Sequence, residues 1–167
     1  MLDTVFGLPV HPLIVHATVV IVPSAALAVL LSALWPRFRD WAGWAPLSLA
    51  VTAVVLAPLS TSSGEPFEKL VGESKLIEEH SHLGDLLIWW VTPLALVAAV
   101  GYWLYTFRGG QPQRQGRGVS AIVSALSVVA TVGTLVMVVL IGHSGAKAAW
   151  SDAGASETTT VAVSTST

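Results

Sequence analysis

The sequence predicts an all-α membrane protein: an antiparallel bundle of four transmembrane helices, with a short extracytoplasmic amphipathic helix between the second and third. The first observation is composition, since 53% of the 167 residues are hydrophobic and only 11% are charged, against roughly 25% charged residues in soluble domains. The second is that four long apolar runs alternate with short polar segments. Runs of about 20 apolar residues suit helices that cross the hydrocarbon core. Residues 1–150 are therefore expected to form a single transmembrane domain.

The four predicted spans follow one another along the chain. The first, about residues 13–34, has no charged residue and is long enough to cross a bilayer at 1.5 Å per residue. The second, about residues 44–59, is shorter and has Pro46 near its first turn. The third, about residues 83–107, is rich in Trp and Tyr, and the fourth, about residues 119–141, is rich in small residues. Small residues allow transmembrane helices to pack closely.

Two segments outside the spans have a different composition. After the second span the chain becomes charged, and Pro66 there suits the first turn of a helix. Phe67, Leu70 and Val71 fall on one face at helical spacing, which predicts the short amphipathic helix. Residues 151–167 form a Ser/Thr-rich C-terminal tail without periodicity, and this composition predicts a disordered or poorly ordered segment.

The charges predict the orientation of the bundle. All five arginines lie in the loops after the first and third spans, whereas nine of the ten acidic residues lie on the other side. The positive-inside rule places the arginine loops in the cytoplasm. We therefore expect a multi-pass protein of the bacterial plasma (inner) membrane with both termini extracytoplasmic. The arginines are Arg37, Arg39, Arg108, Arg114 and Arg117.

All the histidines fall at the predicted extracytoplasmic ends of the spans. Histidine is costly inside a bilayer and is a versatile metal and haem ligand, so this one-sided placement is the main indication of function. The histidines are His11, His16, His80, His82 and His143. Polar residues at the same end are candidates for orienting them by hydrogen bonds. These are Ser63, Glu65, Asp85 and Ser144.

Four motifs carry a family resemblance. His11 to His16 read H-P-L-I-V-H, residues 63–65 read S-G-E, residues 80–85 read H-S-H-L-G-D, and residues 142–150 read G-H-S-G-A-K-A-A-W. Together they resemble a bacterial family of four-helix membrane proteins, the domain of unknown function 2231, in its actinobacterial branch. That branch has Glu where this chain has Asp85. The resemblance covers residues 7–150.

The resemblance also separates the histidines. It implies family histidine positions at His11, His16, His80 and His143, and it matches no family histidine to His82. By analogy with diheme b561-like cytochromes, four-helix proteins of this kind also suggest a b-type haem.

The first functional hypothesis is haem b bound for electron transfer. Helical bundles hold haem between imidazoles of different helices, and the expected ligands are His16, His80 and His143, with His11 near the rim. The same three histidines, with Glu65 or Asp85, are the candidate ligands for a transition metal ion without haem. The chain has no cysteine, which excludes thiolate metal sites and c-type haem attachment.

The alternative hypothesis is a non-catalytic accessory or assembly subunit of a larger membrane (respiratory) complex. The expected partners are the lipid bilayer and either other membrane subunits or a redox partner; a net charge of -2 indicates no nucleic acid. A transporter is less supported because the cytoplasmic half has no intramembrane ionisable group. No catalytic residue is predicted, since a hydrolase function of Ser63 or Ser144 would rest on proximity to histidine alone. An electron-transfer or accessory protein is therefore expected rather than a stand-alone enzyme.

Overall fold

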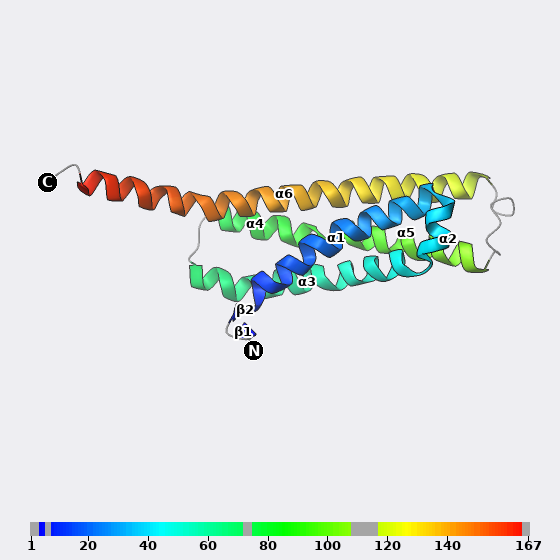
Figure 1. Ribbon diagram of the computed structural model, residues 1–167, viewed down its shortest axis with the longest axis horizontal. Helices are drawn as coiled ribbons and strands as arrows, with labels where there is room; N and C mark the ends of the chain where they lie inside the picture. The colour runs from blue at the N-terminus through cyan, green and yellow to red at the C-terminus, as the bar shows by residue number, and fades with distance from the viewer. Residues whose placement is uncertain (1–3, 6–7, 72–74, 108–116, 165–167) are drawn as a thin grey trace.

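The computed structural model describes the backbone of residues 4–5, 8–71, 75–107 and 117–164, and the side chains of residues 10–64, 75–107 and 118–150. Four helical segments are long and apolar enough to cross a membrane. They pack side by side in alternating directions, so that the start of α1 and the end of α6 lie at the same end (Figure 1). The predicted all-α membrane fold is confirmed. The four candidate spans are Val10–Leu34, Ala45–Gly64, Lys75–Phe107 and Gly118–Trp150.

The chain begins with a small hairpin and the first spanning helix. Strands β1 (Thr4–Val5) and β2 (Leu8–Pro9) pair in antiparallel fashion directly before α1 (Val10–Leu34). The helix ends where Pro36 begins α2 (Pro36–Ala42), because a residue that precedes proline disfavours the helical conformation. Trp35 is accordingly extended, with φ -123° and ψ 99°.

The second spanning helix is longer than its apolar run. Gly43, at φ 55°, turns the chain after α2, and α3 (Ala45–Val71) then continues well past the predicted end at residue 59. Pro66, expected to start a separate helix, lies inside α3. Proline is unfavourable inside a helix because it lacks the N–H that would bond to the preceding turn, and α3 nevertheless continues through this position to Val71.

Phe67, Leu70 and Val71, on which a separate amphipathic helix was predicted, belong to the end of α3, and a short helix, α4 (Lys75–Leu86), follows at the start of the third candidate span. It leads into α5 (Ile88–Phe107) with a single residue between them, and the Trp90 N–H donates to the carbonyl of that residue, Leu87, at 3.0 Å. The last helix, α6 (Arg117–Ser164), has 48 residues. It extends beyond the other helices (Figure 1), where the composition of the tail predicted poor order.

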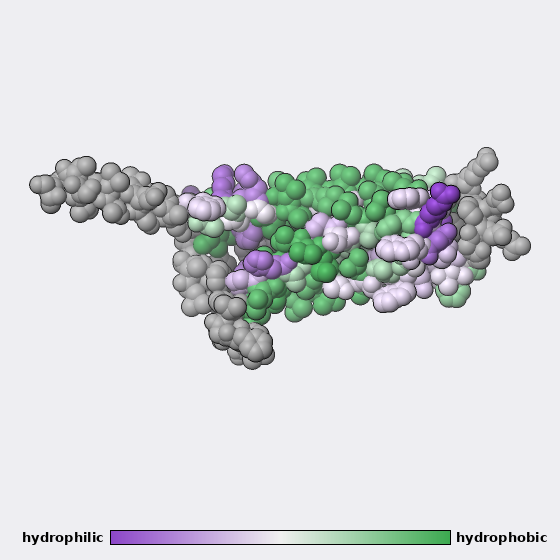
Figure 2. All heavy atoms as spheres, viewed as in Figure 1, coloured by the Kyte–Doolittle hydropathy of each residue, from purple (hydrophilic) through white to green (hydrophobic). Residues whose placement is uncertain are grey.

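Small residues make up much of the core, and many large apolar residues face outward. Ala25, Ala26 and Ala50 are fully buried, whereas Val139 is 68% exposed. Figure 2 shows the result, an apolar band around the middle of the molecule with polar residues toward both ends. This arrangement suits a protein surrounded by lipid, in which close contact between helices stabilises the bundle.

Candidate functional site

The larger of two cavities in the described part of the chain lies near the end of the bundle where α1 begins. It has a volume of about 490 Å³ and is bounded by α1, α3, α4 and α6. Its walls are mostly apolar, and His11 and His80 are the only ionisable side chains among the described residues that line it. The apolar residues in the lining are Val15, Val19, Ala57, Ile77, Leu87, Ile141, Ala148 and Ala149.

His11 is held by the end of α3. It is the second residue of α1, and its Nδ1 lies 3.1 Å from the hydroxyl oxygen of Ser63. The Ser63 hydroxyl donates to the carbonyl of Ser60 at 3.0 Å. The imidazole packs against Gly64, where an added Cβ would lie 3.2 Å from Cε1 of the ring. Glycine at this position therefore lets the ring lie close to the α3 backbone.

His80 is held by α6 in the same way. Its Nδ1 lies 3.1 Å from the hydroxyl oxygen of Ser144 and 3.1 Å from the carbonyl oxygen of Ile141. The Ser144 hydroxyl donates to that same carbonyl at 3.0 Å. The ring packs against Gly145, where an added Cβ would lie 2.9 Å from Cε1. Both imidazoles are thus seated on a Ser-Gly pair of a neighbouring helix.

These hydrogen bonds favour one tautomer of the neutral rings. At His80 the nearby Ile141 carbonyl oxygen can only accept, so Nδ1 of that ring donates and the lone pair is on Nε2. At His11 the Ser63 hydroxyl has the Ser60 carbonyl as its own acceptor, an arrangement that favours donation from Nδ1 to the hydroxyl oxygen. A histidine that binds a metal almost always donates its other ring N–H to an oxygen acceptor. His11 and His80 both have this arrangement.

The other predicted histidines lie elsewhere on the surface. His16 is exposed, and its Nδ1 donates to the carbonyl of Pro12 in its own helix at 2.6 Å. His143 and His82 are also exposed, and none of the three lines the cavity. The five histidines therefore share one end of the bundle but do not converge on one point.

The predicted acidic partners do not join the histidines in a described cluster. Asp85 is exposed on α4. Glu65 belongs to α3, and its side chain lies outside the described residues. Over the part of the chain whose side chains the structure describes, no group of three or more His, Asp or Glu could hold a metal ion.

Sequence reasoning did not identify the two glycines on which the rings lie. A signal was present, because the only two Ser-Gly pairs in the chain, at residues 63–64 and 144–145, follow the second and fourth predicted spans. Each pair also contains the serine that bonds a histidine. The repeated Ser-Gly pair could therefore have predicted two similar sites at which a histidine ring packs on a neighbouring helix.

Comparison with known proteins supports the family resemblance. The model of a family described as a predicted membrane protein family, DUF2231, matches residues 7–158. The match includes all four candidate spans and both Ser-Gly pairs. No curated protein and no solved structure matches the chain significantly. The chain belongs to the DUF2231 family of predicted membrane proteins.

Proposed function

We propose that this protein binds haem b between His11 and His80 and takes part in electron transfer at the extracytoplasmic face of the bacterial plasma membrane. One observation carries the proposal. Two imidazoles from different helices line one largely apolar cavity, and each has its Nδ1 hydrogen-bonded so that Nε2 is the coordinating nitrogen. Haem bound between two histidines needs this pair of donors.

The cavity suits a flat apolar group. Its volume of about 490 Å³ is within the range of about 300–1,000 Å³ common for ligand sites, and its mixture of apolar walls with few polar groups is also typical. Ser63 and Ser144 fix the planes of the two rings, and Gly64 and Gly145 provide the space for them. When bound, haem supplies the one-electron chemistry, while these residues bind and orient it.

Haem is favoured over a bare transition metal ion by the number of protein donors. A porphyrin occupies four positions around its iron, so that two imidazoles complete the coordination. A bare ion such as Zn²⁺ takes three or four protein ligands. His16 and His143, the other expected metal ligands, are exposed and lie away from the cavity lining, and the described side chains contain no three-ligand group.

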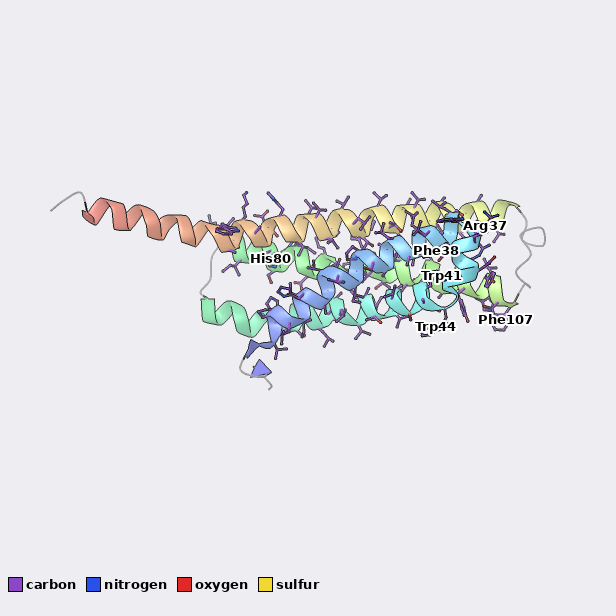
Figure 3. The ribbon with its side chains drawn as sticks, viewed as in Figure 1. Arg37, Phe38, Trp41, Trp44, His80 and Phe107 are labelled. Carbon is purple, nitrogen blue, oxygen red and sulfur yellow. The ribbon has the colours of Figure 1, made fainter. Side chains whose placement is uncertain are left out.

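The distribution of charges supports an extracytoplasmic position for the proposed haem. The labelled residues in Figure 3 put Arg37 and several aromatic side chains at one end of the molecule and His80 near the other. Under the positive-inside rule the arginine end is cytoplasmic, both termini are extracytoplasmic, and a redox partner would approach from outside.

The test is a reduced-minus-oxidised visible spectrum of the purified protein expressed with adequate haem supply. We expect a Soret shift with sharp α and β bands in the wild type, and their loss in His11→Ala and His80→Ala. His82→Ala is the matched control, because His82 is on the same helix as His80 but is exposed, and it should keep the full spectrum. His80→Met retains an axial donor and should retain haem at a higher potential.

Two results would overturn this proposal. One is a wild-type protein that stays colourless when haem is supplied during expression. The other is full haem content in both alanine variants, provided that circular dichroism shows them to be folded.

A colourless protein would favour the second candidate, an accessory or assembly subunit of a larger membrane complex. The observation in its favour is that α6 extends beyond the remaining helices (Figure 1) and so offers a helical segment outside the bundle to a partner subunit. Its test is affinity purification from native membranes of the full chain and of a variant truncated after Trp150. Membrane subunits that co-purify only with the full chain would support it.

A further inference from the structure

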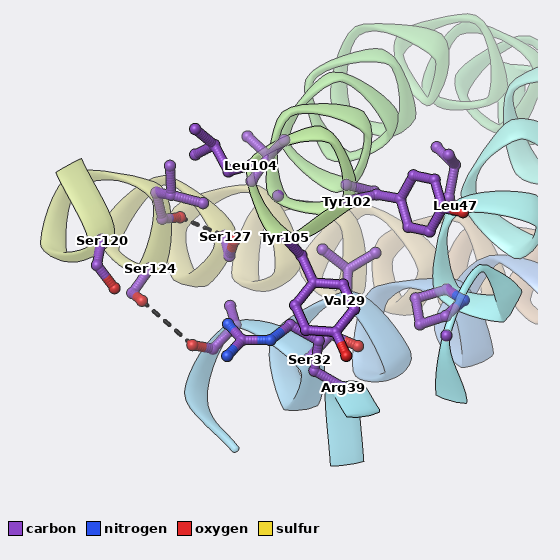
Figure 4. A pocket seen from close by; sticks show the side chains of 17 residues that line it. Val29, Ser32, Arg39, Leu47, Tyr102, Leu104, Tyr105, Ser120, Ser124 and Ser127 are labelled. Atoms are coloured by element: carbon purple, nitrogen blue, oxygen red, sulfur yellow. Dashed lines mark hydrogen bonds between the residues drawn. The ribbon is translucent and has the colours of Figure 1, made fainter. Parts of the chain in front are cut away.

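A second, smaller cavity lies near the opposite end of the bundle and is independent of the proposed haem site. Its volume is about 60 Å³, which leaves room for several water molecules. Residues of α1, α2, α3, α5 and α6 line it, and Figure 4 shows the side chains that face it. The polar residues among them include Arg39, Ser32, Ser120, Ser124, Tyr102 and Tyr105.

Two of the residues that line this cavity carry a buried donor with no hydrogen-bond partner among the described residues. The donors are Nε of Arg39 and the hydroxyl of Ser32. Buried donors are nearly always hydrogen-bonded in proteins, so two of them beside one cavity call for an explanation. The guanidinium of Arg39 is also held in place, because its carbon lies 5.3 Å from the centre of the Tyr105 ring.

The neighbouring polar groups have hydrogen-bond partners of their own. Ser124 donates its proton to the carbonyl of Ala33 at 3.3 Å (Figure 4). Asp40, a nearby acid, is hydrogen-bonded to the Tyr105 hydroxyl and is not among the residues that line the cavity. A permanent cation and an unused hydroxyl donor in a small space favour an oxyanion as ligand.

The position of the cavity relative to the membrane surface indicates which molecule carries the oxyanion. Trp41 is 81% exposed, Trp44 68% and Phe107 73%, and Figure 3 places all three at the same end as Arg37. Exposed aromatic residues of this kind gather at the level of the lipid headgroups. We propose that this cavity binds the phosphate group of a phospholipid, held by the Arg39 guanidinium and the Ser32 hydroxyl.

The test compares a phospholipid with a lipid that lacks its phosphoglycerol headgroup and with inorganic phosphate. The full-length protein in maltoside micelles is titrated with phosphatidylglycerol, with diacylglycerol of the same acyl chains, and with inorganic phosphate against chloride at equal ionic strength. Binding is followed through thermal unfolding by intrinsic tryptophan fluorescence. We expect phosphatidylglycerol to raise the midpoint and diacylglycerol to leave it unchanged.

Matched variants identify the donors. Arg39→Gln should weaken phosphatidylglycerol binding by about tenfold or more, since a hydrogen bond to a charged group contributes about 1.5–3 kcal/mol. Arg37→Gln is the control, because it removes the same charge from the same short helix at an exposed position. Ser32→Ala should weaken binding by a smaller factor. This variant still tests the site if Arg39→Gln does not fold.

Each outcome decides the proposal. A response to inorganic phosphate that depends on Arg39 and Ser32 supports the same phosphate site with a free anion as its source. Equal losses in the two arginine variants would mean binding by surface charge alone and would overturn it. A wild-type unfolding midpoint that neither phosphatidylglycerol nor inorganic phosphate changes would also overturn the proposal. Ordered water would then be the partner of the two donors.

Discussion

Substitution of Gly133 by alanine should separate α5 from α6. The Trp90 ring of α5 lies directly on this glycine of α6, and an added Cβ would lie 1.8 Å from Cζ3 and 1.9 Å from Cε3. Residues on both sides of Gly133 restrict a shift of the backbone. Thr134 is fully buried and donates to the Trp90 carbonyl at 3.4 Å, and Ala130, one turn earlier, is 4% exposed.

The magnitude follows from the displacement required. Ordinary van der Waals contact begins near 3.4 Å, so the ring must move by at least 1.6 Å, the difference between 3.4 and 1.8 Å. Overpacking of a well-packed core costs typically 1–3 kcal/mol, and this displacement belongs at the upper end. Alanine in place of a helical glycine recovers about 1 kcal/mol. We therefore expect Gly133→Ala to lower the free energy of unfolding by about 2 kcal/mol.

The assay is reversible unfolding in mixed micelles, followed by circular dichroism. Gly142→Ala is the control, because it is in the same helix with nothing within 4 Å of the added Cβ, and it should leave stability unchanged or raise it slightly. The decisive comparison is made in a Trp90→Ala background, where Gly133→Ala should become neutral or stabilising. A loss of about 2 kcal/mol in that background as well would refute the contact as its cause.

The remaining predictions concern the histidine end and the orientation. Gly145→Ala should reduce the haem-to-protein ratio of the purified protein more than Gly64→Ala, because the added Cβ would lie 2.9 Å rather than 3.2 Å from its imidazole; equal ratios would argue against the glycines as ring seats. Because the chain has no cysteine, Lys147→Cys and Asp40→Cys each introduce a single thiol at an exposed position. An impermeant maleimide should label Lys147→Cys in intact spheroplasts and Asp40→Cys only after permeabilisation, and the opposite pattern would contradict the proposed orientation.

The spans were predictable because a helix that crosses the hydrocarbon core needs a run of about 20 mostly apolar residues. The predicted end of the first span, residue 34, is the observed end of α1, since the proline at position 36 prevents its continuation. The end of α3 was not predictable from hydropathy. That helix continues through polar residues to Val71. Hydropathy indicates which part of a helix lies in the hydrocarbon core, and it does not indicate where the helix ends. The same argument applies to α6 beyond residue 141.

The histidine end of the bundle was predictable from the sequence, but the directions of the individual side chains were only partly so. His11 and His16 are five residues apart, which at 100° per residue places them about 140° apart around α1. They therefore could not both face one cavity, and the structure places His11 at the cavity and His16 on the outside. Apolar residues surround α1 on all sides, so periodicity alone did not indicate which of the two faces inward.

The two histidine seats are two instances of one arrangement. In each, Nδ1 of a ring on one helix is hydrogen-bonded to a serine of another helix, the serine donates to a carbonyl of its own helix, and the next residue is a glycine under the ring. Contacts that only hold two helices together need not border the same cavity. Here both rings border the same cavity, from α1 and from α4. Two similarly held imidazoles on different helices are the residues that would hold a haem, which would supply one-electron chemistry when bound, and the proposal therefore depends on His11 and His80 together.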